Sequence, residues 1–298
     1  MLAVEAAPIF RRDRSAPYPQ NRFPLAFVHD GVILAATAFA GPGRVLWLSA
    51  AAIAVLMVIV WAVSVRLRDA SIIDPVWGPA FVIVALIAAL AGHGDPARRW
   101  LLFAMTAAWG LRLGVHLTRR KLTELREEDR RYAAMRTREG ERFTLWSLWA
   151  VFGTQGLLVV VVSLPIPVAA NRPGALSAAI VPGVVLFLVG LAFEAVGDEQ
   201  LRRFKADPAH RGKVLDHGLW RYTRHPNYFG DTCVWWGIWL VALPAGGAWW
   251  TLIGPAIMTL FLVRISGKAM LERDIGRRRP EYRDYIRRTS GFFPLPPR

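Results

Sequence analysis

The sequence has 298 residues, of which 54% are hydrophobic, and a formal net charge of +15. Its apolar runs are longer than a soluble core needs, since a helix that crosses a bilayer takes roughly 20 mostly apolar residues. The charge lies between those runs, which is typical of the basic loops that membrane proteins keep on the cytoplasmic side. We therefore expect a membrane protein in contact with membrane lipids, and no nucleic-acid partner.

The composition also limits the chemistry of any site. The single cysteine, Cys233, allows neither an intrachain disulfide nor a cage of cysteine ligands, and we predict no metal site. Residues 1–22 lack the basic start, apolar core and small-residue cleavage site of a signal peptide. We therefore expect no cleaved leader.

Seven apolar segments are predicted to cross the membrane. Backbone groups in a bilayer must be satisfied internally, and these runs do not alternate as barrel strands do, so we predict an all-α, multi-pass protein. The predicted spans are 46–65, 72–91, 100–118, 144–169, 176–196, 226–243 and 247–265. The segment 31–40 is too short to span and is expected to lie at the interface or to pack. Residues 1–45 thus precede one membrane domain, 46–298.

The distribution of basic residues predicts the orientation. Of the 37 Lys and Arg residues, 28 lie in the loops 66–71, 119–143 and 197–225 and in the tail from Arg264. Positive loops are retained in the cytoplasm. We therefore predict an external N-terminus and a cytoplasmic C-terminus.

The third and fifth predicted spans contain polar residues. Trp109, Arg112 and His116 are three and four residues apart and share one helical face. Charged residues in a span often mark function, although a snorkelling arginine is an equally good interpretation here. Near the end of the fifth span stand Glu194, Asp198 and, two turns later, Lys205. Taken alone, these three residues are better explained as an ordinary charged helix end.

The most informative segment is 218–231, at the entry to the sixth span. Pro226 suits the first position of a helix, and His225 before it would lie near the cap. A helix N-terminus favours an anion, and Arg221 and Arg224 immediately precede it. Three further polar side chains, those of Asn227, Tyr228 and Asp231, would cluster on the first turn. A phosphate-bearing ligand fits this arrangement.

The tail adds two groups of residues. Arg264, Lys268 and Glu272 are spaced four apart on one face as the seventh helix ends. Tyr282 and Tyr285 belong to a later aromatic and basic stretch. That stretch could cover the cytoplasmic side of the site or anchor the tail on anionic lipid.

These motifs resemble the steroid 5-alpha-reductase and sterol C14/C7-reductase superfamily. The sequence looks closest to the bacterial branch known as steroid 5-alpha-reductase C-terminal-like, a domain of unknown function. The resemblance covers residues 46–298 and includes three further motifs, Ile-Asp-Pro-x-Trp-Gly from Ile73, Trp-Gly-x-Arg-Leu from Trp109 and Glu-Asp-x-Arg-Tyr from Glu128.

The resemblance implies a seven-helix reductase in a bacterial inner membrane that binds NADPH from the cytoplasmic side. Its apolar lipid or steroid-like substrate would enter from the bilayer, and a hydride would pass to a C=C bond. The implied cofactor-binding residues are Arg112, Asp198, Lys205, Arg224, His225, Asn227, Tyr228, Asp231, Arg264, Lys268, Glu272, Tyr282 and Tyr285.

The sequence departs from the family at the catalytic positions. Family members use a Glu before a proline in the second span and a Tyr before the arginine of the third. Here the nearest equivalents are Asp74 and Trp109. Our candidates for the catalytic acid and proton donor are Asp74 and His116.

Two other functions remain open. Membrane methyltransferases of the isoprenylcysteine and phospholipid type share Arg-His-Pro-x-Tyr-x-Gly and bind S-adenosylmethionine there. The third possibility is a non-enzymatic lipid-binding relative that keeps a degenerate pocket.

Overall fold

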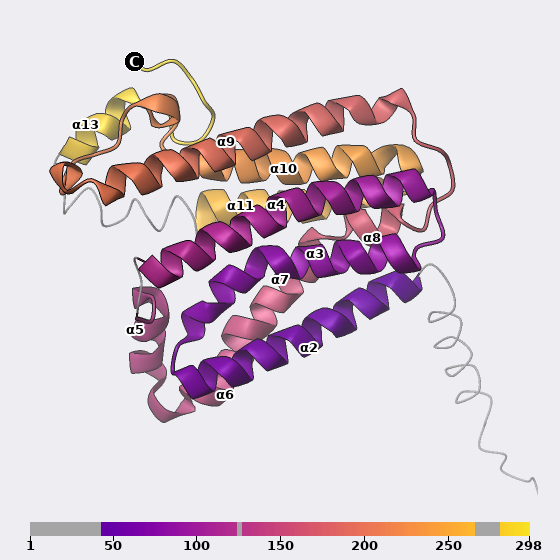
Figure 1. Cartoon of the computed structure of the whole chain (residues 1–298), viewed down its shortest axis with the longest axis horizontal. Coiled ribbons are helices and arrows are strands. Elements are labelled where there is room, and N and C mark those ends of the chain that lie inside the picture. The colour runs from indigo at the N-terminus through magenta and orange to yellow at the C-terminus, as the bar shows by residue number, and fades with distance from the viewer. Residues whose placement is uncertain (1–42, 124–126, 266–280) are drawn as a thin grey trace, which may run out of the picture. The chain divides into compact units, whose positions relative to one another are not determined.

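The computed structural model describes residues 43–123, 127–265 and 281–298. Within residues 42–298, which form one unit, the regular secondary structure of the described residues is helical, and Thr223 and Ser290 form an isolated β-bridge. The predicted interfacial segment 31–40 lies outside the described residues. The main helices are α2 (Gly43–Leu67), α3 (Ile73–Ala91), α4 (Pro96–Thr123), α5 (Arg130–Glu139), α6 (Phe143–Ser147), α7 (Thr154–Val162), α8 (Pro165–Ala169), α9 (Val181–Ala206), α10 (Pro226–Ala242), α11 (Ile253–Leu260) and α13 (Glu281–Arg288) (Figure 1).

Five helical segments of the described chain are long and apolar enough to cross a membrane. They are Gly43–Leu67, Ala70–Ala91, Pro96–Thr123, Arg130–Ala169 and Ala178–Ala206. The prediction of a multi-pass helical protein is confirmed to that extent. The sixth and seventh predicted spans coincide with shorter helices, α10 with 17 residues and the apolar segment Trp249–Ile265. The count of seven and the orientation stay predictions.

The fourth predicted span is not a regular helix. A π-helix, Leu148–Gly153, joins α6 to α7, and α7 ends at Val162 before the short helix α8. Pro165, at the start of α8, has no N–H to continue the hydrogen bonds of the preceding helix. The loop predicted at 119–143 also contains a helix, α5.

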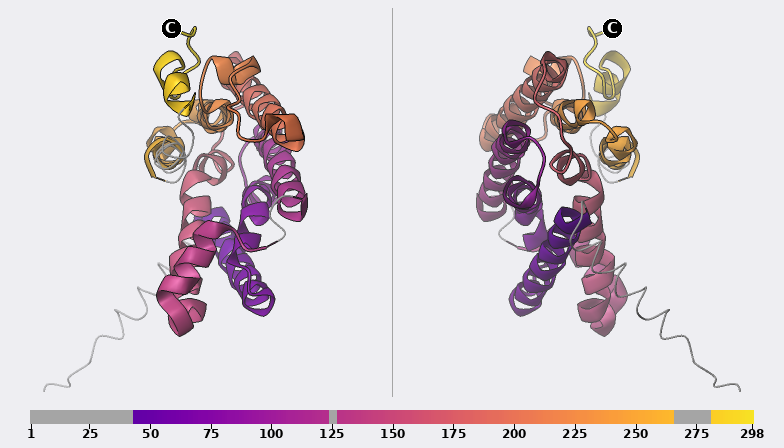
Figure 2. Two further views of the ribbon diagram at one scale, coloured as in Figure 1. Left: turned by 90° about the vertical axis from the view of Figure 1, so that its left-hand side faces the viewer. Right: turned by 90° about the vertical axis from the view of Figure 1, so that its right-hand side faces the viewer.

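Close glycine contacts hold α9 against α10, and the two helices run side by side (Figures 1 and 2). A Cβ added at Gly190 would lie 2.5 Å from the carbonyl oxygen of Gly230, and one at Gly183 would lie 2.8 Å from that of Gly237. Small residues at such positions let helix backbones approach closely, as is common between membrane helices. This packing fixes the start of α10 beside the middle of α9.

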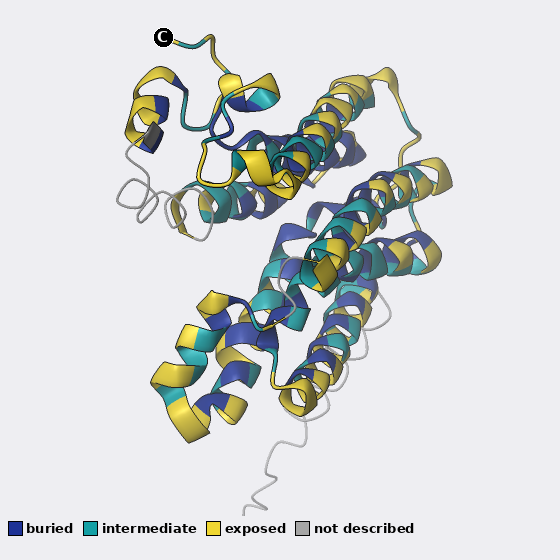
Figure 3. Cartoon of the chain, turned by 60° about the vertical axis from the view of Figure 1, so that its left-hand side comes forward, coloured by how far each residue is buried: buried dark blue, intermediate teal, exposed yellow. Residues whose placement is uncertain are grey.

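Aromatic rings connect this pair to α3 and α4. Phe81 of α3 packs 5.4 Å from Trp109 of α4 and 4.6 Å from Trp235 of α10, measured between ring centroids. All three side chains are buried, whereas many apolar residues of α2 and α9 are exposed (Figure 3). That distribution suits helices with one face on the protein and the other on lipid.

The connection between α2 and α3 provides a test of pH dependence. Partial burial alone would raise the pKa of Asp69, but hydrogen bonds from Lys121 and Ser71 outweigh it and hold the pKa below its usual value. A carboxylate with a lowered pKa stabilises the fold above its unfolded pKa and loses that contribution as the pH falls through the folded pKa. We expect the thermal midpoint of the parent to fall more steeply below about pH 4 than that of Asp69→Asn. Parallel curves would contradict this.

Candidate functional site

The start of α10 carries the polar residues that the sequence analysis singled out. Pro226 is the first residue of the helix, as predicted, and the imidazole of His225 stacks on the ring of Tyr228 with centroids 5.3 Å apart. His225 and Asp231 are buried. Two of the candidate residues at this helix entry, His225 and Tyr228, are therefore in direct contact.

A network of buried charges lies beside this helix entry. The guanidinium of Arg112 donates to carboxylate oxygens of both Glu194 and Asp198, the latter at 2.8 Å. The indole N–H of Trp109 donates to the second oxygen of Glu194 at 2.9 Å. The amide of Asn227 donates to Asp198 at 3.1 Å. Helices α4, α9 and α10 are thus joined through two buried carboxylates.

Two more candidates border this network. His116 Nε2 lies 3.8 Å from Asp198 Oδ2. Asp231 Oδ1 is buried and has no hydrogen-bond partner among the described residues. The guanidinium of Arg112 is therefore surrounded by three acidic side chains, those of Glu194, Asp198 and Asp231. One guanidinium cannot satisfy all of their carboxylate oxygens, so these oxygens can also accept hydrogen bonds from a ligand.

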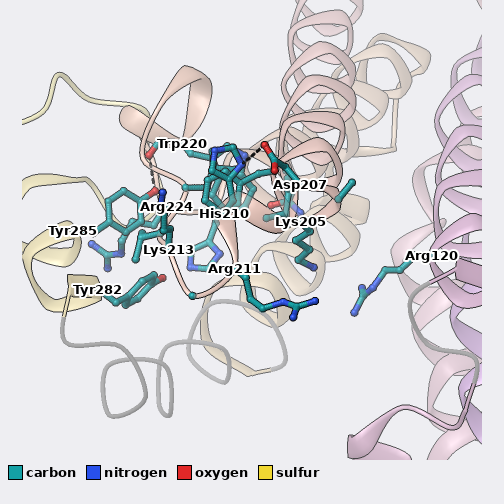
Figure 4. A pocket seen from close by; sticks show the side chains of 18 of the residues that line it. Arg120, Lys205, Asp207, His210, Arg211, Lys213, Trp220, Arg224, Tyr282 and Tyr285 are labelled. Carbon is teal, nitrogen blue, oxygen red and sulfur yellow. Dashed lines mark hydrogen bonds and ion pairs between the residues drawn. The ribbon is translucent and has the colours of Figure 1, made fainter.

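A cavity of about 820 Å³ opens next to the α10 entry. Figure 4 shows side chains of its wall, with Lys205 and Arg211 on one side and Arg120 opposite them on α4. The polar and aromatic residues that line it are Arg120, Asp129, Arg131, Phe204, Lys205, Asp207, His210, Arg211, Lys213, Trp220, Arg224, His225, Asn227, Tyr228, Tyr282 and Tyr285. Basic side chains outnumber acidic ones, so the cavity suits an anion.

The C-terminal segment forms one wall of this cavity. The guanidinium of Arg224 donates to the carbonyl oxygens of Ile286 and Thr289, at 3.2 and 2.6 Å, at the end of α13. The hydroxyl of Tyr285 donates to the carbonyl of Trp220 at 2.5 Å. Tyr282 and Tyr285 line the cavity, which corresponds to one of the two roles considered for the tail, and the hydrogen bonds donated by Arg224 hold that tail in position.

Asp74 belongs to a different cluster. Its two oxygens accept hydrogen bonds from Tyr132 at 2.8 Å and from Arg131 at 2.9 Å, both on α5. Nearby, partial burial alone would raise the pKa of Asp129, but its contacts with Arg131 outweigh burial and lower it. Trp109 and His116 therefore lie at the buried network, whereas Asp74 lies apart from it and is hydrogen-bonded to α5.

The remaining candidates lie at the end of the seventh predicted span. Arg264 is exposed in the π-helix Phe261–Ile265 and lines neither of the two cavities that are described. Lys268 and Glu272 lie outside the described residues.

Several residues of the site were missed from the sequence. Glu194 was interpreted as part of a charged helix end, yet it is 3% exposed and bonded to two side chains. Its position inside an apolar run was the available signal. Arg211, Lys213 and His210 lie in a loop whose path cannot be read from periodicity.

Comparisons with known proteins place this chain in a family. The family model described as "Protein of unknown function (DUF1295)" matches residues 60–289. The chain belongs to that family. The DUF1295 family is associated with steroid 5-alpha-reductase-like membrane proteins, which agrees with the resemblance in the sequence.

A curated protein is also similar over part of the chain. The protein named "Probable O-methyltransferase ustE", of Ustilaginoidea virens, is 34% identical over 90 residues, which are 30% of this chain and 29% of that protein. The match thus spans less than a third of that relative. No solved structure matches significantly.

Proposed function

We propose that this DUF1295 protein is an integral membrane reductase that uses NADPH to saturate a C=C bond of an apolar lipid or steroid-like substrate. The supporting observation is the 820 Å³ cavity beside the buried network, with Arg120, Lys205, Arg211 and Lys213 in its wall. NADPH carries a pyrophosphate and a 2′-phosphate, which lysine and arginine bind through charge-assisted hydrogen bonds.

The size and walls of the cavity fit such a ligand. Its volume lies within the roughly 300–1,000 Å³ typical of ligand cavities. Trp220 and Tyr282 offer flat apolar surfaces, and Asn227 offers an amide at the inner end. In this proposal the four basic residues hold the phosphates, and Asn227, whose amide also donates to Asp198, contacts the ligand at the end nearest the network.

Bound NADPH would supply a hydride to one carbon of the double bond. A proton must then reach the other carbon, and the chain has to deliver it. We assign that step to His116, because the neighbouring carboxylate of Asp198 provides a counter-charge for an imidazolium. Arg112 and Trp109 act as positioning residues that hold the acidic pair through its hydrogen bonds.

Asp74, the other acid suggested by the sequence, takes a different role in this proposal. Both of its carboxylate oxygens are engaged by α5. We therefore assign Asp74 to holding α5, which carries Arg131, against the cavity.

A membrane methyltransferase is the second candidate, because the relative ustE is named an O-methyltransferase. S-adenosylmethionine carries a sulfonium cation and a single carboxylate, so a wall of lysine and arginine suits it less well than a polyphosphate. The three acidic side chains around Arg112 are the feature that would favour it. A non-enzymatic lipid-binding protein would bind ligand without turnover.

The test is ligand-induced stabilisation of the purified protein. A ligand at about 100 times its Kd stabilises a fold by about 2.7 kcal/mol. We expect NADPH to raise the thermal midpoint, S-adenosylmethionine not to, and Arg211→Gln to weaken NADPH binding about tenfold through loss of one charge-assisted hydrogen bond. Arg142→Gln removes the same charge from an exposed site that does not line the cavity, and serves as the control.

The outcomes separate the candidates. Stabilisation by S-adenosylmethionine alone would replace the reductase with the methyltransferase. NADPH binding without oxidation in the presence of extracted lipids would leave a non-enzymatic protein. Equal effects of the Arg211 and Arg142 variants would remove the cavity from the binding site.

A further inference from the structure

A second cavity lies between α4 and α9 and measures about 380 Å³. Arg120 lines both it and the first cavity, and Arg112, His116 and Asp198 of the buried network also line it. Leu111, Val115 and Arg119 line it from α4, and they are spaced four residues apart on one helical face. Leu111 is 54% exposed and Val115 is 51% exposed. One end of the groove is therefore apolar and open at the side, and the other end is basic.

The charges in this groove do not balance. Arg112 is paired with Asp198, and Arg202 donates two hydrogen bonds to Glu199 at 2.7 Å. Both acidic residues that line the groove are thus matched by an arginine. Arg119 and Arg120 also line it, and neither side chain has a hydrogen bond or an ion pair within the described residues.

Arg120 also has a buried donor, its Nε, without a hydrogen-bond partner in the described structure, a feature that it shares with Arg98, Arg99 and Arg112. A buried donor without a partner is costly, so it marks a position where a ligand acceptor is favourable. A snorkelling arginine would instead turn its whole guanidinium to water.

We infer that this groove binds the phosphate of an anionic membrane phospholipid. Arg119 and Arg120 bind the phosphate head, and an acyl chain lies along Leu111 and Val115 toward the bilayer. The combination of two cations that have no ion pair among the described residues with an adjoining exposed apolar face matches a lipid and not a free phosphate, which would gain nothing from the apolar end. Binding here requires no nucleotide, so it can be tested apart from the proposed reductase activity, although the groove shares Arg112, His116 and Asp198 with the buried network.

The experiment measures lipid binding to the delipidated, detergent-purified full chain without any nucleotide. Phosphatidylglycerol and phosphatidylcholine with identical acyl chains are titrated, and the thermal midpoint is followed. We expect phosphatidylglycerol to stabilise the parent at lower concentration than phosphatidylcholine. Arg119→Gln should weaken the phosphatidylglycerol affinity about fivefold, which corresponds to about 1 kcal/mol for one basic residue at the surface.

Two controls keep the inference falsifiable. Arg66→Gln removes a basic residue from the last turn of α2, which lines neither cavity, and should leave the affinity unchanged. Arg119→Lys keeps the charge and should retain most of the binding. Equal losses in the Arg66 and Arg119 variants would mean general surface electrostatics and would overturn the site.

The lipid source is tested in parallel. Inorganic phosphate should not reproduce the stabilisation at the concentrations at which the lipid saturates. If it does, or if phosphatidylcholine binds as well as phosphatidylglycerol, the assignment to an anionic lipid is wrong. Because NADPH is absent throughout, a failure of the reductase proposal leaves this result untouched.

Discussion

Replacing Arg112 with methionine should lower the free energy of unfolding by about 3 kcal/mol or more. The guanidinium of Arg112 is the partner of both Glu194 and Asp198, whose side chains are only 4% and 8% exposed. Removing one member of a buried ion pair leaves an uncompensated charge, which costs about 3–5 kcal/mol. The measurement is thermal or denaturant unfolding of the detergent-purified variant against the parent.

The cause can be separated from a general packing defect. Adding Glu194→Gln to the Arg112→Met background removes one of the stranded carboxylates and should recover part of the loss. Arg112→Lys should recover little of the stability that Arg112→Met loses, because one ammonium does not reproduce the planar guanidinium that reaches two carboxylates. A double variant no more stable than Arg112→Met would show that charge is not the reason.

Gly230→Ala is expected to disrupt both the fold and the site. A Cβ at this position would lie 2.5 Å from the backbone nitrogen of Glu194 and 2.5 Å from the carbonyl oxygen of Gly190. Backbone atoms cannot turn aside as a flexible side chain does, so α9 and α10 must separate. Overpacking of this kind costs about 1–3 kcal/mol, and occasionally more. Separation of the two helices would also displace Glu194 from Trp109. We therefore expect that NADPH no longer raises the thermal midpoint of this variant.

The matched control is Gly153→Ala, the same change in the π-helix that precedes α7. There the nearest atom to the added Cβ is the Leu148 carbonyl oxygen at 3.2 Å, and the next lies at 3.9 Å. This variant should keep most of its stability and its ligand response. A Gly230→Ala protein as stable as Gly153→Ala would show that the two helices are not in tight backbone contact.

The positions of most helices could be predicted from the sequence because apolar runs and proline act locally. Pro226 predicted the first residue of α10. The fifth membrane span was predicted to end at 196, yet α9 continues to Ala206 with Arg202 and Arg203 exposed, because a helix does not stop where hydrophobicity does. The segment 144–169 was predicted as one continuous span, so neither the break at Pro165 nor the π-helix, which depends on tertiary packing, was predicted.

The site was less predictable, because its contacts join distant parts of the chain. The residues Trp109, Arg112 and His116 were found from helical spacing, but their partner Glu194 is 82 residues from Arg112. Asp74 resembled a catalytic acid from its motif alone, and its engagement by Tyr132, 58 residues away, was invisible to periodicity. Which carboxylates are paired and which are open is decided by tertiary structure.

Arg120 lines both cavities, so their occupants share one guanidinium. Two anions that draw on the same cation compete for it, and thermodynamic linkage makes the penalty equal in both directions. If the lipid in the groove lowers nucleotide affinity by some factor, the nucleotide lowers lipid affinity by that same factor. The surface charge of the surrounding membrane would then set the nucleotide concentration at which the protein is half saturated.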